Sequence, residues 1–218
     1  MTVFHLSETD RTGGLTIPSM FRLAASGYRE KPAVYDGEHL LTYGQLDEMS
    51  DRIACGLKYL GVKSGDRVMF LLKPDYRLIP AILGISKAGA SFVPAYPAEC
   101  ISYIIKDSQS VMLISSKQIK TAEKYYYTEI DKLLCTEAEP ELLPDVNREN
   151  LACMIYYPGA AGCLKRVMVS HRQITDIVNP DSPSQREAAA SVFFDILLSE
   201  IFVPLMNGRF VGLGRQKP

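Results

Sequence analysis

Residues 151–172 read LACMIYYPGAAGCLKRVMVSHR, and the fold of the chain can be worked out from this stretch. Its first seven residues, 151–157, form an apolar run that predicts a short buried strand. The run ends at Pro158-Gly159, and a second glycine follows at Gly162. Small residues of this kind let backbone N–H groups approach an anion closely, so the segment is suited to a phosphate loop.

Two cations and a second strand follow the glycines. Lys165 and Arg166 precede the apolar run 167–169, and Ser170-His171 can then open a helix. The order strand, small-residue loop, cation and strand can hold a phosphate. An ordinary glycine turn between two strands also fits, and the local residues taken alone favour that interpretation. The Walker A pattern G-x-x-x-x-G-K-[ST] does not occur in the chain.

The clearest helical pattern lies further towards the N-terminus. Thr42 and Gln45 fit a capping box, in which each side chain satisfies a free backbone N–H. Gly61 is a suitable C-terminal stop. Between them the apolar residues follow at helical spacing: Leu46, Met49, Ile53, Leu57 and Leu60. A helix is therefore predicted from Thr42 to Gly61.

Strands and helices alternate along the rest of the chain. A hairpin is predicted at 33–43 with Asp36-Gly37 as its turn, and Asp75 is predicted to cap a helix that runs to residue 87. The tyrosines at 125–127 are predicted to end a helix and pack on the sheet, or else to form an interaction patch. Further strands are predicted at 67–72, 91–94, 111–115 and 191–195, and further helices at 18–28, 117–127 and 196–206. This alternation predicts an α/β fold with mostly parallel sheets covered by helices.

The composition indicates a globular protein and gives no sign of a nucleic-acid or membrane partner. The 218 residues are 47% hydrophobic, enough for one large domain or two small ones with a real core. A formal charge of -1 favours neither nucleic acid nor a membrane as a partner. Residues 1–16 are predicted to be a loose leader that lacks the layout of a signal peptide. The cysteines form no C-x-x-C pair, which argues against zinc and disulfides and favours the cytoplasm: Cys55, Cys100, Cys135, Cys153 and Cys163.

The stretch 151–172 also resembles a known signature. Adenylate-forming enzymes (acyl-CoA synthetases, luciferases and nonribosomal peptide synthetase adenylation domains) carry a loop close to Y-T-S-G-S-T-G-x-P-K-G-V-x-x-x-H. The frame of that pattern is kept here at Gly159, Gly162, Lys165, Val167 and His171. The resemblance implies that the loop wraps the β- and γ-phosphates of ATP, with magnesium as the accompanying ion. It assigns this role to Tyr157, Gly159, Gly162 and Lys165.

The loop departs from the family pattern in its chemistry. The hydroxyl-bearing positions are occupied by Tyr157, Pro158 and two alanines, and the glycine after the lysine is Arg166. Alanine has no side-chain donor, and proline also lacks a backbone N–H. Hydrogen bonds to charged groups contribute about 1.5–3 kcal/mol each, so ATP binding is expected to be weak or lost. Lys165, together with Arg166, is expected to recover part of it.

Other motifs extend the resemblance over residues 17–218. LTYGQL at 41–46, SKAGASFVP at 86–94 and the segment 98–108 match family motifs in order and spacing, with Cys100 in place of an arginine. The resemblance therefore implies the N-terminal portion of the large domain of an adenylate-forming enzyme.

One residue indicates the class of substrate. Phe194-Asp195 followed by Glu200 resembles the family segment F-D-x-S-x-x-E-I-F. In amino-acid-activating members this aspartate binds the α-ammonium group, which implies that Asp195 is a substrate contact and that the substrate is an amino acid. Asp195 also fits a simple helix N-cap. Leu197 and Ser199 differ from the residues usual in that pocket.

The family's later motifs, with their catalytic lysine and ribose-binding aspartate, lie beyond residue 218. The chain is therefore expected to be truncated and inactive alone. It carries no predicted catalytic residue, and its histidines (His5, His39 and His171) lack metal-ligand spacing. Two alternatives stay open. One is an interaction or dimerisation module with an exposed sheet flank, and the other is half of a split enzyme completed by a partner chain.

Overall fold

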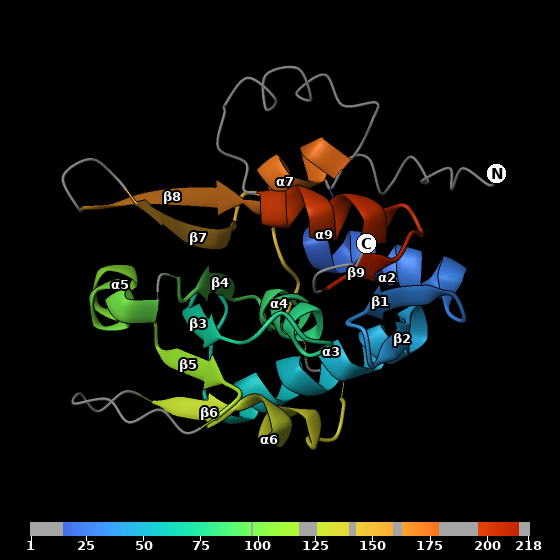
Figure 1. Ribbon diagram of the computed structural model, residues 1–218, viewed down its shortest axis with the longest axis horizontal. Coiled ribbons are helices and arrows are strands. Elements are labelled where there is room, and N and C mark those ends of the chain that lie inside the picture. The colour runs from blue at the N-terminus through green and yellow to red at the C-terminus, as the bar shows by residue number, and fades with distance from the viewer. Residues whose placement is uncertain are drawn as a thin grey trace.

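A mostly parallel sheet runs through the computed structural model, which describes residues 15–96, 98–117, 126–139, 143–158, 163–178 and 196–213 (Figure 1). Its strands lie in the order β6 (Tyr127–Glu129), β5 (Met112–Ser115), β3 (Arg67–Leu71), β4 (Ser91–Pro94), β7 (Leu151–Pro158) and β8 (Leu164–Ser170). Neighbours pair in parallel except β7 and β8, which are antiparallel. The predicted α/β class with a mostly parallel sheet is confirmed.

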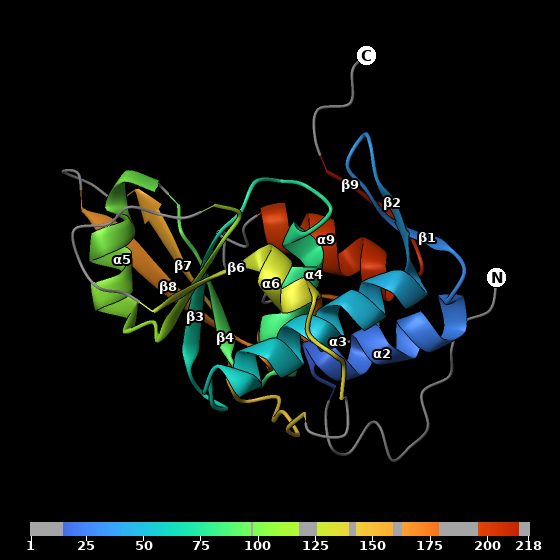
Figure 2. The same ribbon diagram turned by 90° about the horizontal axis from the view of Figure 1, so that it is seen from below.

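Helices cover both faces of this sheet (Figure 2). Helices α3 (Tyr43–Tyr59) and α4 (Leu78–Lys87) lie on one face, and α5 (Ile101–Ser108), preceded by the short helix η1 (Ala98–Cys100), lies on the other. Every residue of α4 is buried, because the helix is enclosed between the sheet and α3. The two helices approach closely at Gly84, where an added Cβ would lie 2.6 Å from a methyl of Ile53 and 2.9 Å from the carbonyl oxygen of Ser50.

A second, smaller sheet joins the two ends of the described chain. Strand β1 (Pro32–Tyr35) pairs with β2 (Leu40–Thr42) on one side and with β9 (Val211–Gly212) on the other. The remaining helices are α2 (Ile17–Tyr28), α6 (Ile130–Leu134), α7 (His171–Val178) and α9 (Ile196–Met206). The buried Tyr43 hydroxyl lies 2.7 Å from the Leu205 carbonyl and 2.8 Å from that of Arg209, which ties α3 to the end of α9.

The predicted hairpin turn is present, and Asp36 organises it. Its carboxylate accepts hydrogen bonds from the backbone N–H groups of Glu38 and His39, and from that of Tyr76 in a distant segment. Burial raises the pKa of Asp36, but these hydrogen bonds, with one from the His39 side chain, outweigh burial and bring it down to about 2. The turn is therefore held to the segment before α4 by an ionised carboxylate.

Lys87, in the SKAGASFVP motif, holds three helices together. Its buried Nζ lies 2.6 Å from Asp47 Oδ1 and 2.7 Å from Asp51 Oδ1, both on α3. The same ammonium lies 5.6 Å from the centre of the Phe21 ring. A buried charge is tolerated only when it is paired in this way, so Lys87 joins α2, α3 and α4.

Local predictions succeeded for most elements. The Thr42–Gln45 capping box is confirmed, and a second box at Thr16 starts α2. The Asp75 cap was wrong: α4 begins at Leu78 without a side-chain cap, because Asp75 instead binds the backbone N–H and guanidinium of Arg77.

The tyrosines at 125–127 also differ from the expectation. Tyr127 lies in strand β6, and Tyr126 is 82% exposed, so Tyr126 does not pack on the sheet. The helix predicted at 117–127 falls mainly on residues outside the described part, as do residues 1–14 of the predicted leader and the strand predicted at 191–195.

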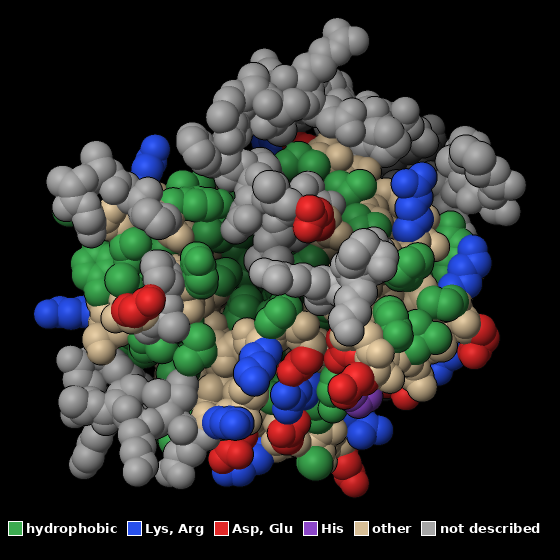
Figure 3. Space-filling view, in the orientation of Figure 1, with side chains coloured by type: hydrophobic (Ala, Val, Ile, Leu, Met, Phe, Trp, Pro, Cys, Tyr) green, Lys and Arg blue, Asp and Glu red, His purple; other side chains and the backbone are tan. Residues whose placement is uncertain are grey.

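The surface carries both signs of charge. On the face shown in Figure 3, Lys and Arg side chains are interspersed with Asp and Glu side chains over its lower half. Hydrophobic side chains gather on the left of that view, where α5 lies. Of the helices in the described segments, not one has the length and apolar character needed to cross a bilayer.

Candidate functional site

The β7–β8 hairpin carries the predicted phosphate loop. Its register pairs Tyr157 with Lys165, and Tyr156 with Arg166. Paired residues of an antiparallel ladder share one face of the sheet, and the next pair lies on the opposite face. The structure thus places Tyr157 and Lys165 on one face of the hairpin. The other two predicted residues, Gly159 and Gly162, lie outside the described residues.

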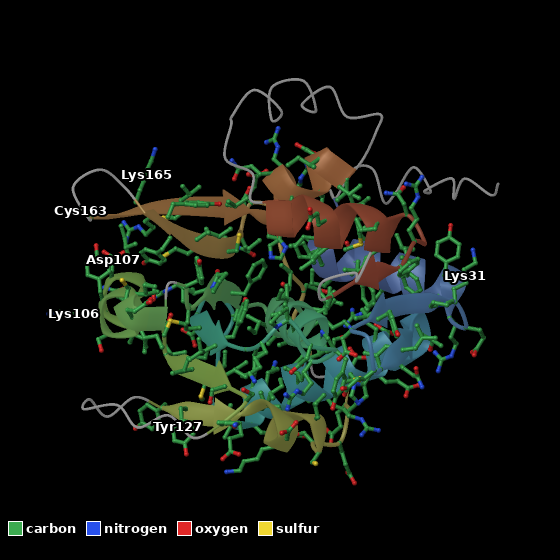
Figure 4. The ribbon with its side chains drawn as sticks, in the orientation of Figure 1. Lys31, Lys106, Asp107, Tyr127, Cys163 and Lys165 are labelled. Carbon is green, nitrogen blue, oxygen red and sulfur yellow. The ribbon has the colours of Figure 1, made fainter. Side chains whose placement is uncertain are left out.

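Lys165 is available to a ligand. Its side chain is exposed, and it forms no hydrogen bond or ion pair with any residue in the described segments. Figure 4 shows it pointing away from the hairpin on the side opposite Asp107. Because β7 runs parallel to β4, the loop after it leaves the carboxyl end of the sheet. Open α/β sheets bind their ligands at that end.

Arg166 is directed elsewhere. Its Nη1 lies 3.0 Å from Asp107 Oδ2, near the end of α5, on the face opposite Lys165. The Asp107 carboxylate raises the pKa of Arg166. The expectation that Arg166 assists Lys165 at the phosphate was therefore wrong, because the ion pair with Asp107 holds the guanidinium on the other side of the strand.

Tyr156 shares the same carboxylate. Its buried hydroxyl donates to Asp107 Oδ2 at 2.6 Å, and its ring meets that of Tyr103 edge-on. Burial, assisted by the Asp107 hydrogen bond, raises the pKa of Tyr156, so the hydroxyl keeps its proton. Sequence reasoning missed this cluster. The sequence marked Asp107 only through the family motif at 98–108, which did not indicate its partners.

His171, the last residue of the signature pattern, links two helices. It starts α7, and its Nδ1 lies 3.4 Å from the backbone N–H of Ile17 at the start of α2. Burial lowers the pKa of His171 to about 4. The imidazole is therefore neutral near pH 7 and acts as a hydrogen-bond acceptor between two helices.

The substrate contact and the metal cannot be placed on described side chains. Asp195 lies outside the described residues, directly before α9. Within the described segments, His, Cys, Asp and Glu side chains form no group of three or more that could hold a metal ion. The described part of the hairpin accordingly offers a cation for phosphate oxygens and no carboxylate set for magnesium.

Comparisons with known proteins agree with this architecture. A family model described as AMP-binding enzyme matches residues 21–218. Surfactin synthase subunit 1 of Bacillus subtilis is 35% identical over 208 residues, which cover 89% of this chain and 6% of that protein. Bacitracin synthase 3 of Bacillus licheniformis is 31% identical over 98% of this chain and 4% of its own length. The chain thus spans a small part of these relatives.

Solved structures show the same fold. The N-terminal subdomain of Klebsiella oxytoca NpsA, in complex with 3-hydroxybenzoyl-AMSN, superposes with a TM-score of 0.78 at 20% identity, over 93% of this chain and 55% of that one. The AMPPNP-bound form of FmoA3 (S1046A), a nonribosomal peptide synthetase, superposes with a TM-score of 0.76 at 21% identity, over 96% of this chain and 25% of that one.

Proposed function

This chain belongs to the AMP-binding enzyme family, and from that premise we propose that it is the N-terminal part of an adenylation domain of the nonribosomal peptide synthetase type. The parent reaction is ATP-dependent activation of a carboxylate. The names of the relatives, peptide synthases for surfactin and bacitracin, support an amino acid as the substrate. Asp195 is proposed to bind its α-ammonium group.

The observation that carries the proposal is the position of Lys165. It is an exposed cation without a described partner, on the same hairpin face as Tyr157 and next to the loop that leaves β7. Lys165 is proposed to neutralise phosphate oxygens of ATP, while Gly159 and Gly162 let backbone N–H groups approach them. Bound Mg-ATP would supply the adenylyl group, which the carboxylate would accept through the α-phosphorus as pyrophosphate leaves.

The loop composition predicts weak binding and no adenylation by this chain alone. Ala160 and Ala161 stand where the family pattern has hydroxyl residues, and Pro158 removes one backbone donor. Catalysis requires the carboxylate, the α-phosphate and compensating charge to be held together. In the described part of the β7–β8 hairpin, Lys165 is proposed to carry most of that task, so the phosphate would be held with little directional control.

Calorimetric titration with Mg-ATP tests the proposal. We expect wild-type binding in the range of about 0.1–1 mM, and about tenfold weaker binding after Lys165→Ala. Lys106→Ala is the matched control, because Lys106 is an exposed lysine on neighbouring α5 and its removal changes the net charge equally. Equal affinities of the wild type and Lys165→Ala would remove the phosphate role, as would no binding by the wild type at millimolar ATP.

A second candidate is protein interaction through an edge of the large sheet. Strand β8 is an edge strand of that sheet, and Met168 on it is 54% exposed. An edge strand presents unpaired backbone groups that can pair with another chain, either a second copy or a chain that completes a split enzyme. Light scattering after size-exclusion chromatography decides the first case: a dimer supports it, and a monomer at the highest attainable concentration excludes it.

A further inference from the structure

The stem of the β7–β8 hairpin is attached to α5 at one carboxylate. Asp107 Oδ2 accepts from the Tyr156 hydroxyl at 2.6 Å and from Arg166 Nη1 at 3.0 Å. Tyr156 and Arg166 are themselves a pair in the β7–β8 register. One acceptor therefore holds both strands at the same level. These three residues are called the Asp107 cluster below.

The cluster lies next to the proposed phosphate loop. Tyr156 is three residues before Gly159, and Arg166 directly follows Lys165. Because Lys165 and Arg166 are consecutive in a strand, anchoring Arg166 to α5 on one face directs Lys165 to the other. Figure 4 shows this arrangement, with Asp107 and Lys165 on opposite sides of the hairpin.

Burial makes the attachment stronger than a surface ion pair. The Tyr156 side chain is almost fully buried and packs against Tyr103, whereas Arg166 stays partly exposed. A hydrogen bond to an ionised carboxylate is stronger than a neutral one, and losing its acceptor would leave the buried hydroxyl unpaired. Arg166 replaces a glycine of the family pattern, so its half of the cluster depends on a residue that the pattern does not contain.

We propose that Asp107 is a positioning residue, which fixes the β7–β8 hairpin on α5 through Tyr156 and Arg166 and so orients Lys165 towards a bound phosphate. This inference rests on the proposed phosphate role of the loop. Asp107 does not touch the phosphate in this arrangement, since it lies on the other face of the hairpin. It acts through the strand that carries Lys165.

Hydrogen exchange measured by mass spectrometry tests the attachment without any nucleotide. In Asp107→Ala, amides in peptides 151–158 and 163–170 should exchange about tenfold faster, while peptides from α3 and α4 should be unchanged. Arg166→Gln and Tyr156→Phe should each give a smaller increase, and Arg166→Lys should exchange close to the wild-type rate. Arg29→Gln, which breaks a remote exposed ion pair of 2.9 Å, is the control and should leave the hairpin unchanged.

Titration with Mg-ATP tests the consequence for the loop. Asp107→Ala should weaken binding about tenfold, and Arg166→Lys should restore most of the loss seen with Arg166→Gln. Hairpin exchange that is equal in the wild type and Asp107→Ala would overturn the proposal. Faster exchange with unchanged ATP affinity would also overturn it. If the wild type binds no ATP, the proposed function fails, and the exchange data alone then decide whether Asp107 fixes the hairpin.

Discussion

His171 should make the stability of this fold depend on pH in the mildly acidic range. The residue is 1% exposed and lies 3.4 Å from the backbone N–H of Ile17 through Nδ1. Burial lowers its pKa from 6.5 to about 4 in the folded chain. Between these two values the unfolded state binds a proton that the folded state does not, so stability is greatest above pH 6.5 and falls as the pH decreases towards 4.

The size of the effect follows from the difference in pKa. Each pH unit inside the window costs about 1.4 kcal/mol of unfolding free energy, so lowering the pH from 7 to 4.5 should cost about 2 kcal/mol at this one group. His171→Asn removes the titration and retains an acceptor oxygen near the position of Nδ1. The variant should therefore lose about 2 kcal/mol less than the wild type over the same range.

Urea unfolding at pH 7, 6, 5 and 4.5 measures this difference. A constant offset between the two proteins reflects packing around residue 171 and does not enter the comparison, which concerns the change with pH. His39→Asn, at an exposed histidine, should retain the wild-type decline. Parallel curves for the wild type and His171→Asn would refute the reasoning, because they would show that His171 is not the group that resists protonation.

Three further changes test the packing and the charges of the fold. Gly84→Ala should lower the free energy of unfolding by about 1–3 kcal/mol, because the new methyl meets α3; an unchanged thermal midpoint would contradict that close approach. Lys87→Met should cost about 3–5 kcal/mol in urea unfolding, since it leaves Asp47 and Asp51 unpaired; an equally stable variant would show that these carboxylates are well solvated. Asp36→Asn should destabilise the chain at pH 5, and this difference should shrink by about 1 kcal/mol by pH 3, because the folded pKa of about 2 lies below the unfolded value of 3.8; a pH-independent difference would contradict the ionised turn.

Local elements could be predicted because their causes lie within a few residues. The capping box at Thr42 needs only Gln45, three positions along the chain, and both side chains form the expected bonds. The apolar run that became β7 needs only its own composition. Asp75 shows the limit of such reasoning, since the capping signal was outcompeted by a guanidinium two residues away.

The candidate site was predicted in part for the same reason. The sequence predicted two strands joined by a glycine-containing loop, and the structure adds the register that pairs Tyr157 with Lys165. The ion pair of Arg166 could not be predicted, because its partner Asp107 lies 59 residues earlier in the chain, on α5. The acceptor role of His171 depends on a residue 154 positions away.

The sequence by itself determined the fold class, the strand–loop–strand frame around the glycines and the family to which they point. Periodicity, caps and turn residues act over one or two turns of the chain, so they can be read from the sequence. The motif can be recognised by its spacing even though its hydroxyl residues are replaced. Tertiary structure alone decided that, within the described part of the chain, Arg166 forms an ion pair and Lys165 does not. The ion pair of Arg166 depends on which face of β8 packs against α5, and this face is set by the order of strands in the sheet. The packing of distant elements, through burial and opposite charge, thus left Lys165 exposed and held Arg166 against Asp107.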